Sequence, residues 1–296
     1  MPLKEKNWLW PLRLGLLLVL FGGILQALPA QAAAISCGEC HDQITTDYGH
    51  TYHGRAGLAQ GFDCLACHGP DERHLNDPSR ENIVSYGKNS IQTITEQNQL
   101  CLECHKSTPE VSLWEMSRHC HNDVACVNCH KIHSRNSKVN EPAVCYTCHR
   151  DLRLAFNKIS HHPIVEGKIK CSDCHNSHGT LTPKMLTDDD LNQLCYRCHA
   201  EKRGPFAWEH PPVSENCAIC HDPHGSRHEK LLKDKVANLC QDCHNADLHS
   251  SRAYDAGSGF AKAKRAGSIG FAGRSCLNCH GNIHGSTHFE KRAFTR

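Results

Sequence analysis

Cysteine and histidine recur together along this chain at one fixed spacing. Twenty of the 21 cysteines fall in ten copies of Cys-x-x-Cys-His. Two thiols at this spacing can form thioether bonds to the two vinyl groups of one haem, and the adjacent imidazole can bind the haem iron. The pattern therefore predicts ten covalently attached haem c groups.

We number the motifs one to ten in chain order. The cysteines expected to bind haem are Cys37, Cys40, Cys64, Cys67, Cys101, Cys104, Cys126, Cys129, Cys145, Cys148, Cys171, Cys174, Cys195, Cys198, Cys217, Cys220, Cys240, Cys243, Cys276 and Cys279. The histidines expected as proximal iron ligands are His41, His68, His105, His130, His149, His175, His199, His221, His244 and His280.

Other uses of paired cysteines explain the pattern less well. A disulfide framework suits short secreted chains and needs no histidine after every second cysteine. Zinc sites combine Cys-x-x-Cys with a second such pair or with spaced histidines. A thioredoxin-like motif needs a βαβ frame, which the residue pattern around these motifs does not show.

A second set of histidines lies outside the motifs at recurring positions. Those expected as distal iron ligands are His53, His74, His119, His133, His161, His162, His178, His210, His224, His249 and His284. Taking one of the doublet His161 and His162 gives one distal histidine for each haem. Iron with two histidines is six-coordinate, which suits electron transfer and leaves no open position for a substrate.

Some positions stay open at this level. Either His161 or His162 can serve, and His228 and His288 compete with their neighbours His224 and His284. His119 is preferred to His121 because His119, like His210, stands seven residues before the next motif. The remaining thiol, Cys120, is read as an inert small residue, with an intermolecular disulfide or a redox role as the alternative.

The motifs group into five haem-pair units within a domain spanning 35–296. The units cover about 35–76, 95–135, 141–180, 188–228 and 236–290. About 26 residues for each haem cannot build a conventional core, so haems must provide it. The expected fold is a multihaem cytochrome c: an elongated, mostly irregular chain with short α-helices, wrapped around a haem array, with little or no β-sheet.

Short helices are expected to lead into the motifs. Thr95 is the expected N-cap of a helix that runs into Cys101, and residues 188–195 are expected to form a similar helix into Cys195. The long haem-free stretches 77–95 and 253–274 are expected to be solvated loops, with a partner-docking surface as the alternative.

The N-terminus predicts export. Basic residues precede an apolar run from Leu14 to Leu28 and small residues near Ala34, so residues 1–34 are expected to be a signal peptide, with an uncleaved anchor as the alternative. The whole chain has 33 basic and 31 acidic residues. No basic patch indicates nucleic-acid binding. The expected location is the periplasm.

Several longer blocks are specific enough to indicate a family. They include the run from Cys195 to Val213, Asp222-Pro-His-Gly-Ser226, residues 161–168, Trp114-Glu-Met-Ser-Arg-His119 and Ile283-His-Gly-Ser286. With the ten motifs, they make the chain resemble the MtrA/DmsE family of decahaem c-type cytochromes, which includes the MtoA and PioA relatives. The resemblance covers nearly the whole mature chain. Cys120-His121 departs from the family pattern, and the chain lacks the long N-terminal extension of PioA.

The resemblance implies a function. Family members sit inside an outer-membrane β-barrel porin on its periplasmic side. They conduct electrons between a periplasmic or inner-membrane cytochrome and an extracellular donor or acceptor, such as a metal oxide, Fe(II) or an extracellular multihaem cytochrome. An electron carrier associated with the outer membrane, not an enzyme, is therefore expected. A free periplasmic shuttle and a multihaem oxidoreductase with an open iron are the alternatives.

Overall fold

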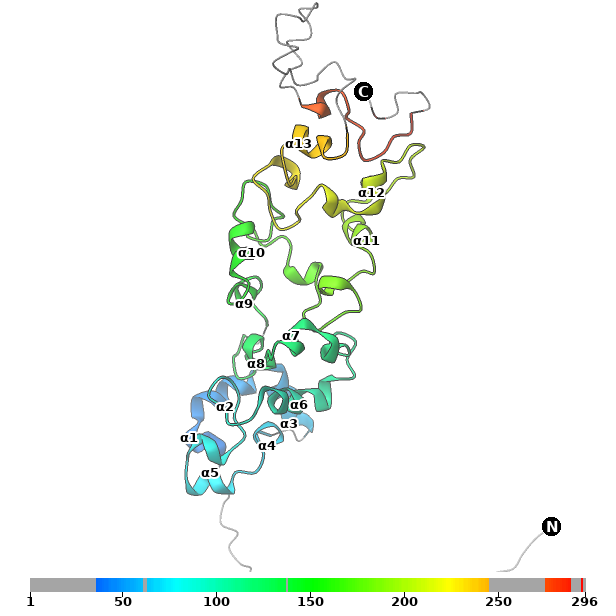
Figure 1. Ribbon diagram of the computed structural model, residues 1–296. Helices are drawn as coiled ribbons and strands as arrows, with labels where there is room; N and C mark the ends of the chain where they lie inside the picture. Colours follow the sequence, from blue (N-terminus) through cyan, green and yellow to red (C-terminus); the bar gives the residue numbers. More distant parts are fainter. Residues whose placement is uncertain (1–35, 61–62, 137, 245–274, 289–293, 295–296) are drawn as a thin grey trace, which may run out of the picture.

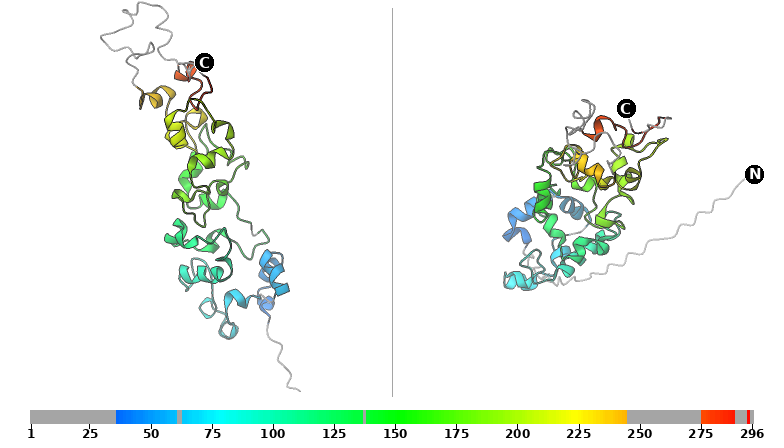
Figure 2. Two further views of the ribbon diagram at one scale, coloured as in Figure 1. Left: turned by 90° about the vertical axis from the view of Figure 1, so that its right-hand side faces the viewer. Right: turned by 45° about the horizontal axis from the view of Figure 1, so that its top comes forward.

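The computed structural model describes residues 36–60, 63–136, 138–244, 275–288 and 294. The expected signal peptide, His249 and the stretch 253–274 lie outside the described residues. The described chain is elongated, and its haem-pair units follow one another along the long axis in sequence order (Figures 1 and 2). Each unit therefore has its sequence neighbours as its spatial neighbours.

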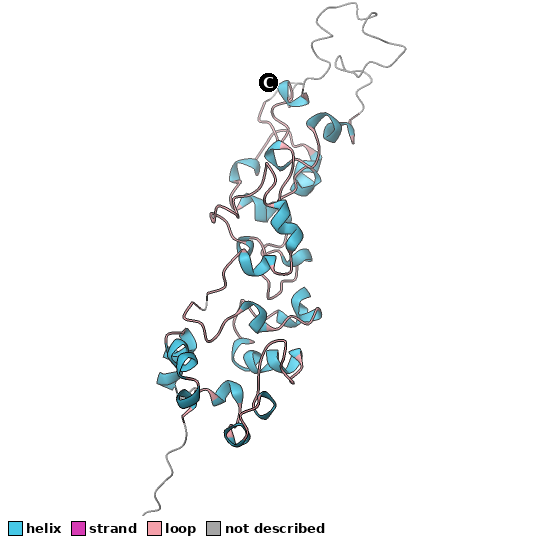
Figure 3. Cartoon of the chain, turned by 90° about the vertical axis from the view of Figure 1, so that its left-hand side faces the viewer, coloured by secondary structure: helices cyan, strands magenta, loops and turns pink. Residues whose placement is uncertain are grey.

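The regular structure of the described residues consists of short helices (Figure 3). The α-helices are α1 (Cys37–Cys40), α2 (Asp42–Gly49), α3 (Tyr52–Gln60), α4 (Leu65–His68), α5 (Glu72–Asn76), α6 (Ile94–His105), α7 (Arg118–His121), α8 (Cys126–Cys129), α9 (Ala143–Tyr146), α10 (Arg150–Ala155), α11 (Leu191–Tyr196), α12 (Pro211–Glu215) and α13 (Val236–Gln241). The 3-10 helices are η1 (Arg80–Asn82), η2 (Trp114–Met116), η3 (Cys171–Asp173), η4 (Pro183–Met185), η5 (Ala200–Lys202), η6 (Cys217–Ile219), η7 (Glu229–Leu231) and η10 (Cys276–Asn278).

No β-strand occurs among the described residues, where pairing is limited to isolated bridges. These bridges join Ser160 to Ser226, His175 to Leu186, Trp208 to Ser286 and His221 to Leu232. The expected fold class, an irregular chain with short helices and little or no sheet, is therefore confirmed. In the same described part, no helix is both long and apolar enough to span a bilayer.

The buried apolar side chains are few. Within the described residues they are Leu102, Trp114, Ala125, Phe156, Ile164 and Leu194. A protein chain of this length normally buries a continuous apolar core in its interior. So small a set supports the expectation that prosthetic groups fill the interior.

The helices that precede motifs three and seven begin with side-chain caps. The expected cap Thr95 is wrong by two residues: Thr93 is the N-cap of α6, and its hydroxyl accepts a hydrogen bond from the Glu96 amide while the Glu96 carboxylate accepts one from the Thr93 amide. This reciprocal capping box satisfies two otherwise unpaired amides, which explains why the helix begins earlier. In α11 the carboxylate of Asp190 accepts from the amides of Asn192 and Gln193.

Candidate haem-binding sites

Nine of the ten motif histidines face a second histidine ring across a nearly constant gap. The ring centres are 5.8–6.3 Å apart in all nine pairs. In motif order, one to nine, the pairs are His41–His74, His68–His133, His105–His53, His130–His178, His149–His119, His175–His224, His199–His162, His221–His284 and His244–His210. For the tenth motif histidine, His280, the expected partner His249 lies outside the described residues.

The gap fits one metal ion between two imidazoles. An imidazole nitrogen lies about 2 Å from a bound first-row metal ion, and about 1 Å from its own ring centre, so two rings on opposite sides of one ion have centres about 6 Å apart. Two parallel rings stacked face to face in van der Waals contact, about 3.5–4 Å apart, would lie closer together than this. The paired residues therefore fit haem iron held from both faces.

Backbone carbonyls fix the tautomer of several paired rings. Nδ1 lies 2.7 Å from the Val84 carbonyl oxygen in His68, 2.9 Å from that of Lys184 in His175 and 2.7 Å from that of Lys230 in His221. A carbonyl oxygen only accepts, so Nδ1 must carry the proton and donate. Nε2 is then left with its lone pair, which is the form that binds iron.

Burial favours neutral imidazole at most distal positions. It lowers the pKa of His53, His133, His178, His210, His224 and His284, and the nearby ring of the paired histidine lowers the pKa of His133 and His224 further. A metal ligand must be unprotonated on the binding nitrogen. These positions therefore hold histidine in its ligating state at neutral pH.

The nine pairs fall into two geometric classes. The ring planes lie 15–22° apart in motifs two, four, six and eight, which we call the even sites. In motifs three, five and seven, the inner odd sites, they are 77°, 69° and 48° apart. The pairs of motifs one and nine have planes 16° and 19° apart and resemble the even sites.

Most pairs join two neighbouring units. His224 of the fourth unit faces His175 of the third, and His162 of the third faces His199 of the fourth. The same exchange occurs at the other three junctions between units, so that only His41–His74 lies within one unit among the described pairs. The units therefore do not carry self-contained ligand sets.

Glycine lets the even-site histidine reach the preceding unit. A Cβ atom at Gly225, after His224, would lie 2.1 Å from the Ala155 carbonyl oxygen, and one at Gly179, after His178, would lie 2.3 Å from that of Leu113. Both glycines have positive φ, +144° and +113°. Only glycine permits this backbone and this close approach.

The two distal histidines of a junction are also linked to each other. Nδ1 of His119 donates to the carbonyl of Ser177, which precedes His178, at 2.8 Å. Nδ1 of His162 donates in the same way to Pro223, which precedes His224, at 2.7 Å. The loop that carries the even-site histidine therefore orients the odd-site histidine.

The doublet left open by the sequence has two different environments. His162 faces His199, with ring centres 6.3 Å apart. His161 instead lies 3.1 Å from the Glu166 carboxylate, and that hydrogen bond, together with one to the Lys158 carbonyl, raises its pKa. The geometry thus supports His162 as the ligand.

The histidines that compete for the remaining distal positions have different partners from the paired rings. His228 lies 3.9 Å from Asp234, while its competitor His224 faces His175. His284, not His288, faces His221. Nδ1 of His121, the alternative to His119, donates to the Ser117 carbonyl at 2.7 Å. Burial raises the pKa of the thiol of Cys120, the one cysteine outside the motifs.

Thiols of successive motifs lie together along the chain, and their sulfur atoms stand for the thioether sulfurs of attached haem. The first cysteines of the two motifs in a unit form thiol contacts: Cys37–Cys64, Cys101–Cys126, Cys145–Cys171, Cys195–Cys217 and Cys240–Cys276. Between units the second cysteine of one motif is close enough to a thiol of the next for that thiol's charge to raise its pKa: Cys67 with Cys101 and Cys104, Cys129 with Cys148, Cys174 with Cys198 and Cys220 with Cys243. The attachment points therefore form one unbroken row from motif one to motif ten.

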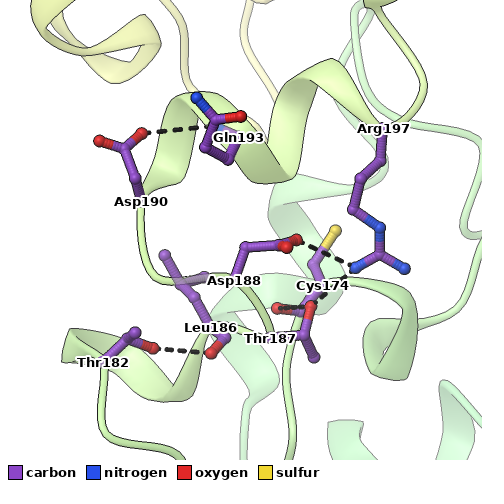
Figure 4. Close-up of polar contacts among 8 residues, drawn as sticks. All are labelled: Cys174, Thr182, Leu186, Thr187, Asp188, Asp190, Gln193 and Arg197. Carbon is purple, nitrogen blue, oxygen red and sulfur yellow. Dashed lines mark hydrogen bonds and ion pairs between the residues drawn. The ribbon is translucent and has the colours of Figure 1, made fainter.

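Polar contacts tie motif six to motif seven (Figure 4). Arg197, between the two cysteines of motif seven, donates to the Thr187 hydroxyl at 3.0 Å and to the Asp188 carboxylate at 3.1 Å. The amide of Thr187 donates to the Cys174 carbonyl of motif six at 3.0 Å. These contacts fix the relative position of two consecutive attachment points across a unit boundary.

Buried asparagines that the sequence interpretation missed join the two motifs of a unit. Asn98 accepts from the Cys126 amide at 2.8 Å and donates to the Val124 carbonyl at 3.0 Å. Asn192 accepts from the Cys217 amide at 2.7 Å and donates to the Val213 carbonyl at 2.9 Å. The shared run Asn-Gln-Leu-Cys before motifs three and seven was the available signal.

Two protein-family models match parts of this chain. The family model of the doubled CXXCH motif matches residues 161–204 and 210–249, and that of the cytochrome c-type protein NrfB-like family matches residues 64–142. Each doubled-motif match pairs an even motif with the next odd one, across a boundary between our predicted units.

Two relatives of known identity are similar to the chain. The multiheme cytochrome MtrA of Shewanella baltica is 44% identical over 266 residues, which is 86% of this chain and 79% of that protein. The cytochrome c-type protein NrfB of Escherichia coli O6:H1 is 28% identical over 126 residues, 35% of this chain and 65% of that protein.

Proposed function

The chain belongs to the family of the multiheme cytochrome MtrA, and from this membership we propose that it is a ten-haem electron carrier of the periplasm. As a multihaem cytochrome with covalently bound haem c, it transfers electrons. The finer proposal is that it conducts them through an outer-membrane β-barrel porin. The electrons pass between a periplasmic or inner-membrane cytochrome and an extracellular donor or acceptor, such as a metal oxide, Fe(II) or an extracellular multihaem cytochrome.

The observation that carries this proposal is the unbroken row of attachment points. Each of motifs one to nine has a thiol that either contacts a thiol of the next motif, within a unit, or has its pKa raised by the charge of one, across a unit boundary. Bound haem supplies an iron that alternates between Fe(III) and Fe(II). A chain that sets its attachment points in such a row, along one elongated axis, supports transport over its whole length (Figure 1).

The histidine pairs support a carrier and not a catalyst. Each of the nine described pairs supplies an imidazole to both faces of one iron, so that the chain's own side chains leave no position for a substrate. We assign the proximal role to the motif histidines. The distal role goes to His74, His133, His53, His178, His119, His224, His162, His284 and His210 for motifs one to nine. His249 remains the predicted ligand for motif ten.

The porin partnership is tested by gentle solubilisation of outer membranes, followed by affinity purification of a tagged cytochrome. We expect a β-barrel protein to co-purify in a fixed ratio to haem. A cytochrome that washes out entirely with the soluble periplasm would support a free shuttle instead. Turnover of nitrite or hydroxylamine by the purified protein, with a high-spin ferric signal, would support an oxidoreductase.

A further inference from the structure

The first cysteines of the two motifs in a unit lie together, but the groups around them differ between units. In the second unit, the neutral side chain of Asn98 is only 5% exposed. Its amide oxygen accepts from the Cys126 amide at 2.8 Å. The contact with Cys126 lowers the pKa of Cys101, and burial opposes that lowering. No acidic or basic side chain contributes to it.

The third unit uses a carboxylate at the corresponding place. Pro142 stands three residues before Cys145, where Asn98 stands three residues before Cys101. Proline has no side-chain amide to accept such a hydrogen bond, and the neighbouring Glu141 accepts one in its place. The Glu141 carboxylate accepts from the amide of Ser172, the residue after Cys171, at 2.9 Å.

This carboxylate approaches the sulfur atoms of both Cys145 and Cys171. We call motifs five and six, to which these cysteines belong, the central pair. A carboxylate oxygen of Glu141, Sγ of Cys145 and Sγ of Cys171 lie within 4.8 Å of one another, the only such grouping of potential ligand atoms among the described residues. Contact with Cys171 and burial raise the pKa of Cys145, and the charge of Glu141 raises it further. The grouping is not a free metal site, because both sulfurs become haem thioethers.

We propose that Glu141 sets the reduction potentials of the haems at motifs five and six below those of the haems at motifs three and four. The inference rests on the proposed function, since it requires haem at these motifs. Haem bound at these motifs would pass one electron from an Fe(II) centre, which is oxidised, to a neighbouring Fe(III) centre, which is reduced, with no bond made or broken. A fixed negative charge stabilises the more positive ferric state, more strongly where water is excluded.

Other charged side chains also act on the cysteines of the neighbouring motifs. Contact with Cys145 lowers the pKa of Cys171, and the carboxylates of Glu141 and, more weakly, Asp173 oppose that lowering. Arg197 acts in the opposite direction at Cys174, the second cysteine of motif six. In the fourth unit, Asp190 acts on Cys195 and Cys217, but its carboxylate caps α11 and does not form such a close three-atom group. Glu141 is therefore the carboxylate that distinguishes the central pair.

The consequence for transport is a fall in reduction potential between motifs four and five, in the middle of the row. Electrons occupy the central pair less than the pair before it, so one side chain controls passage between the two halves of the molecule. Replacing the carboxylate with a neutral amide removes this fall without removing any haem. The amide oxygen of glutamine can still accept from Ser172.

The test is a spectroelectrochemical titration of the purified, fully loaded protein and of Glu141→Gln, followed by the haem α-band. We expect two of the ten haems to titrate at higher potential in the variant than in the parent protein. Glu141→Asp keeps the charge and should titrate like the parent protein. Glu115→Gln makes the same change in net charge at a surface ion pair with Lys106 and should leave the curve unchanged.

The outcomes separate this inference from the proposed function. A Glu141→Gln curve that superimposes on the parent's, with all haems bound, overturns the role of Glu141 and leaves the carrier function intact. Haem missing from motifs five and six of the parent protein would contradict the proposed function itself. Should Glu141→Gln lose haem, Glu141→Ala and Glu141→Asp provide the same comparison, and an unchanged curve for a loaded Glu141→Ala overturns the inference equally.

Discussion

The even sites and the inner odd sites are built from the same two side chains but are held in different ways. At an even site such as His175–His224, the ring planes are 20° apart, and the distal histidine lies in a loop that reaches the preceding unit through Gly225. At an odd site such as His199–His162, the planes are 48° apart, and the distal histidine is oriented by the carbonyl of Pro223 within that same loop.

This difference gives the junction between the third and fourth units a hierarchy. The even-site loop depends on backbone contacts with the preceding unit, since Ser226 and Ser160 exchange two backbone hydrogen bonds of 2.7 and 3.1 Å. His162 is oriented by the loop through Pro223, whereas the loop is also anchored by Ser160. Damage to the loop should therefore open two irons, and damage to the odd-site ligand only one.

The largest effect is expected from Gly225→Ala. The new Cβ atom would lie 2.1 Å from a backbone carbonyl oxygen at a φ of +144°, and the backbone strain alone costs about 1–3 kcal/mol. We expect high-spin signals from two haems in each chain, at motifs six and seven, measured by electron paramagnetic resonance. Gly49→Ala, where a Cβ atom meets nothing within 4 Å, is the matched control. A low-spin Gly225→Ala protein would show that the loop does not need glycine.

A smaller effect should follow from His162→Ala. This change removes only the distal ring of motif seven, so one high-spin haem in each chain is expected while motif six stays six-coordinate. His161→Ala is the control, because His161 interacts with Glu166 and should leave every haem low-spin. The reverse result, with His161→Ala opening a haem, would assign the ligand to the other member of the doublet.

Asn192→Ala tests a contact within a unit, which lies outside the hierarchy of the junction. Asn192 is 4% exposed, and the change leaves the Cys217 amide and the Val213 and Ser214 carbonyls without this partner. We expect the free energy of unfolding to fall by about 1–3 kcal/mol, measured by denaturant titration, with all haems still low-spin. Asn157→Ala, at an exposed position, should change it little; equal losses from both variants would refute the structural role of Asn192.

The smallest effect needs no substitution. When two imidazole planes are parallel, both rings donate to the same iron orbital, whereas perpendicular planes donate equally to two orbitals. The low-temperature electron paramagnetic resonance spectrum of the oxidised protein should therefore contain rhombic low-spin signals from the even sites and broad signals of large maximum g from motifs three and five, whose planes are 77° and 69° apart. A single low-spin class would remove the distinction between the sites.

The sequence predicted the parts of these sites better than their connections. The Cys-x-x-Cys-His motif is local and chemically specific, so its haem role and the irregular helical fold followed from spacing alone. The pairing did not, because His68 and His133 are 65 positions apart and spacing cannot tell which ring crosses to which unit. Grouping two spare histidines with each unit predicted one distal histidine for each motif but concealed their exchange between units.

The helix start at Thr93 and the doublet show the same limit at shorter range. Thr95 is a good N-cap residue, but the reciprocal bond between Thr93 and Glu96 decided the start of α6. His161 and His162 are identical in sequence terms, and only the positions of Glu166 and His199 distinguish them. In both cases the deciding contact depends on the folded backbone.

The central claim is that histidine holds every haem iron from both faces in one continuous row. Near-infrared magnetic circular dichroism of the fully oxidised protein tests it most directly, because the charge-transfer band of low-spin ferric haem reports the axial ligand pair. We predict bis-histidine intensity equal to ten haems in each chain. A stoichiometric high-spin ferric contribution, or intensity from fewer than ten bis-histidine haems, would contradict the account.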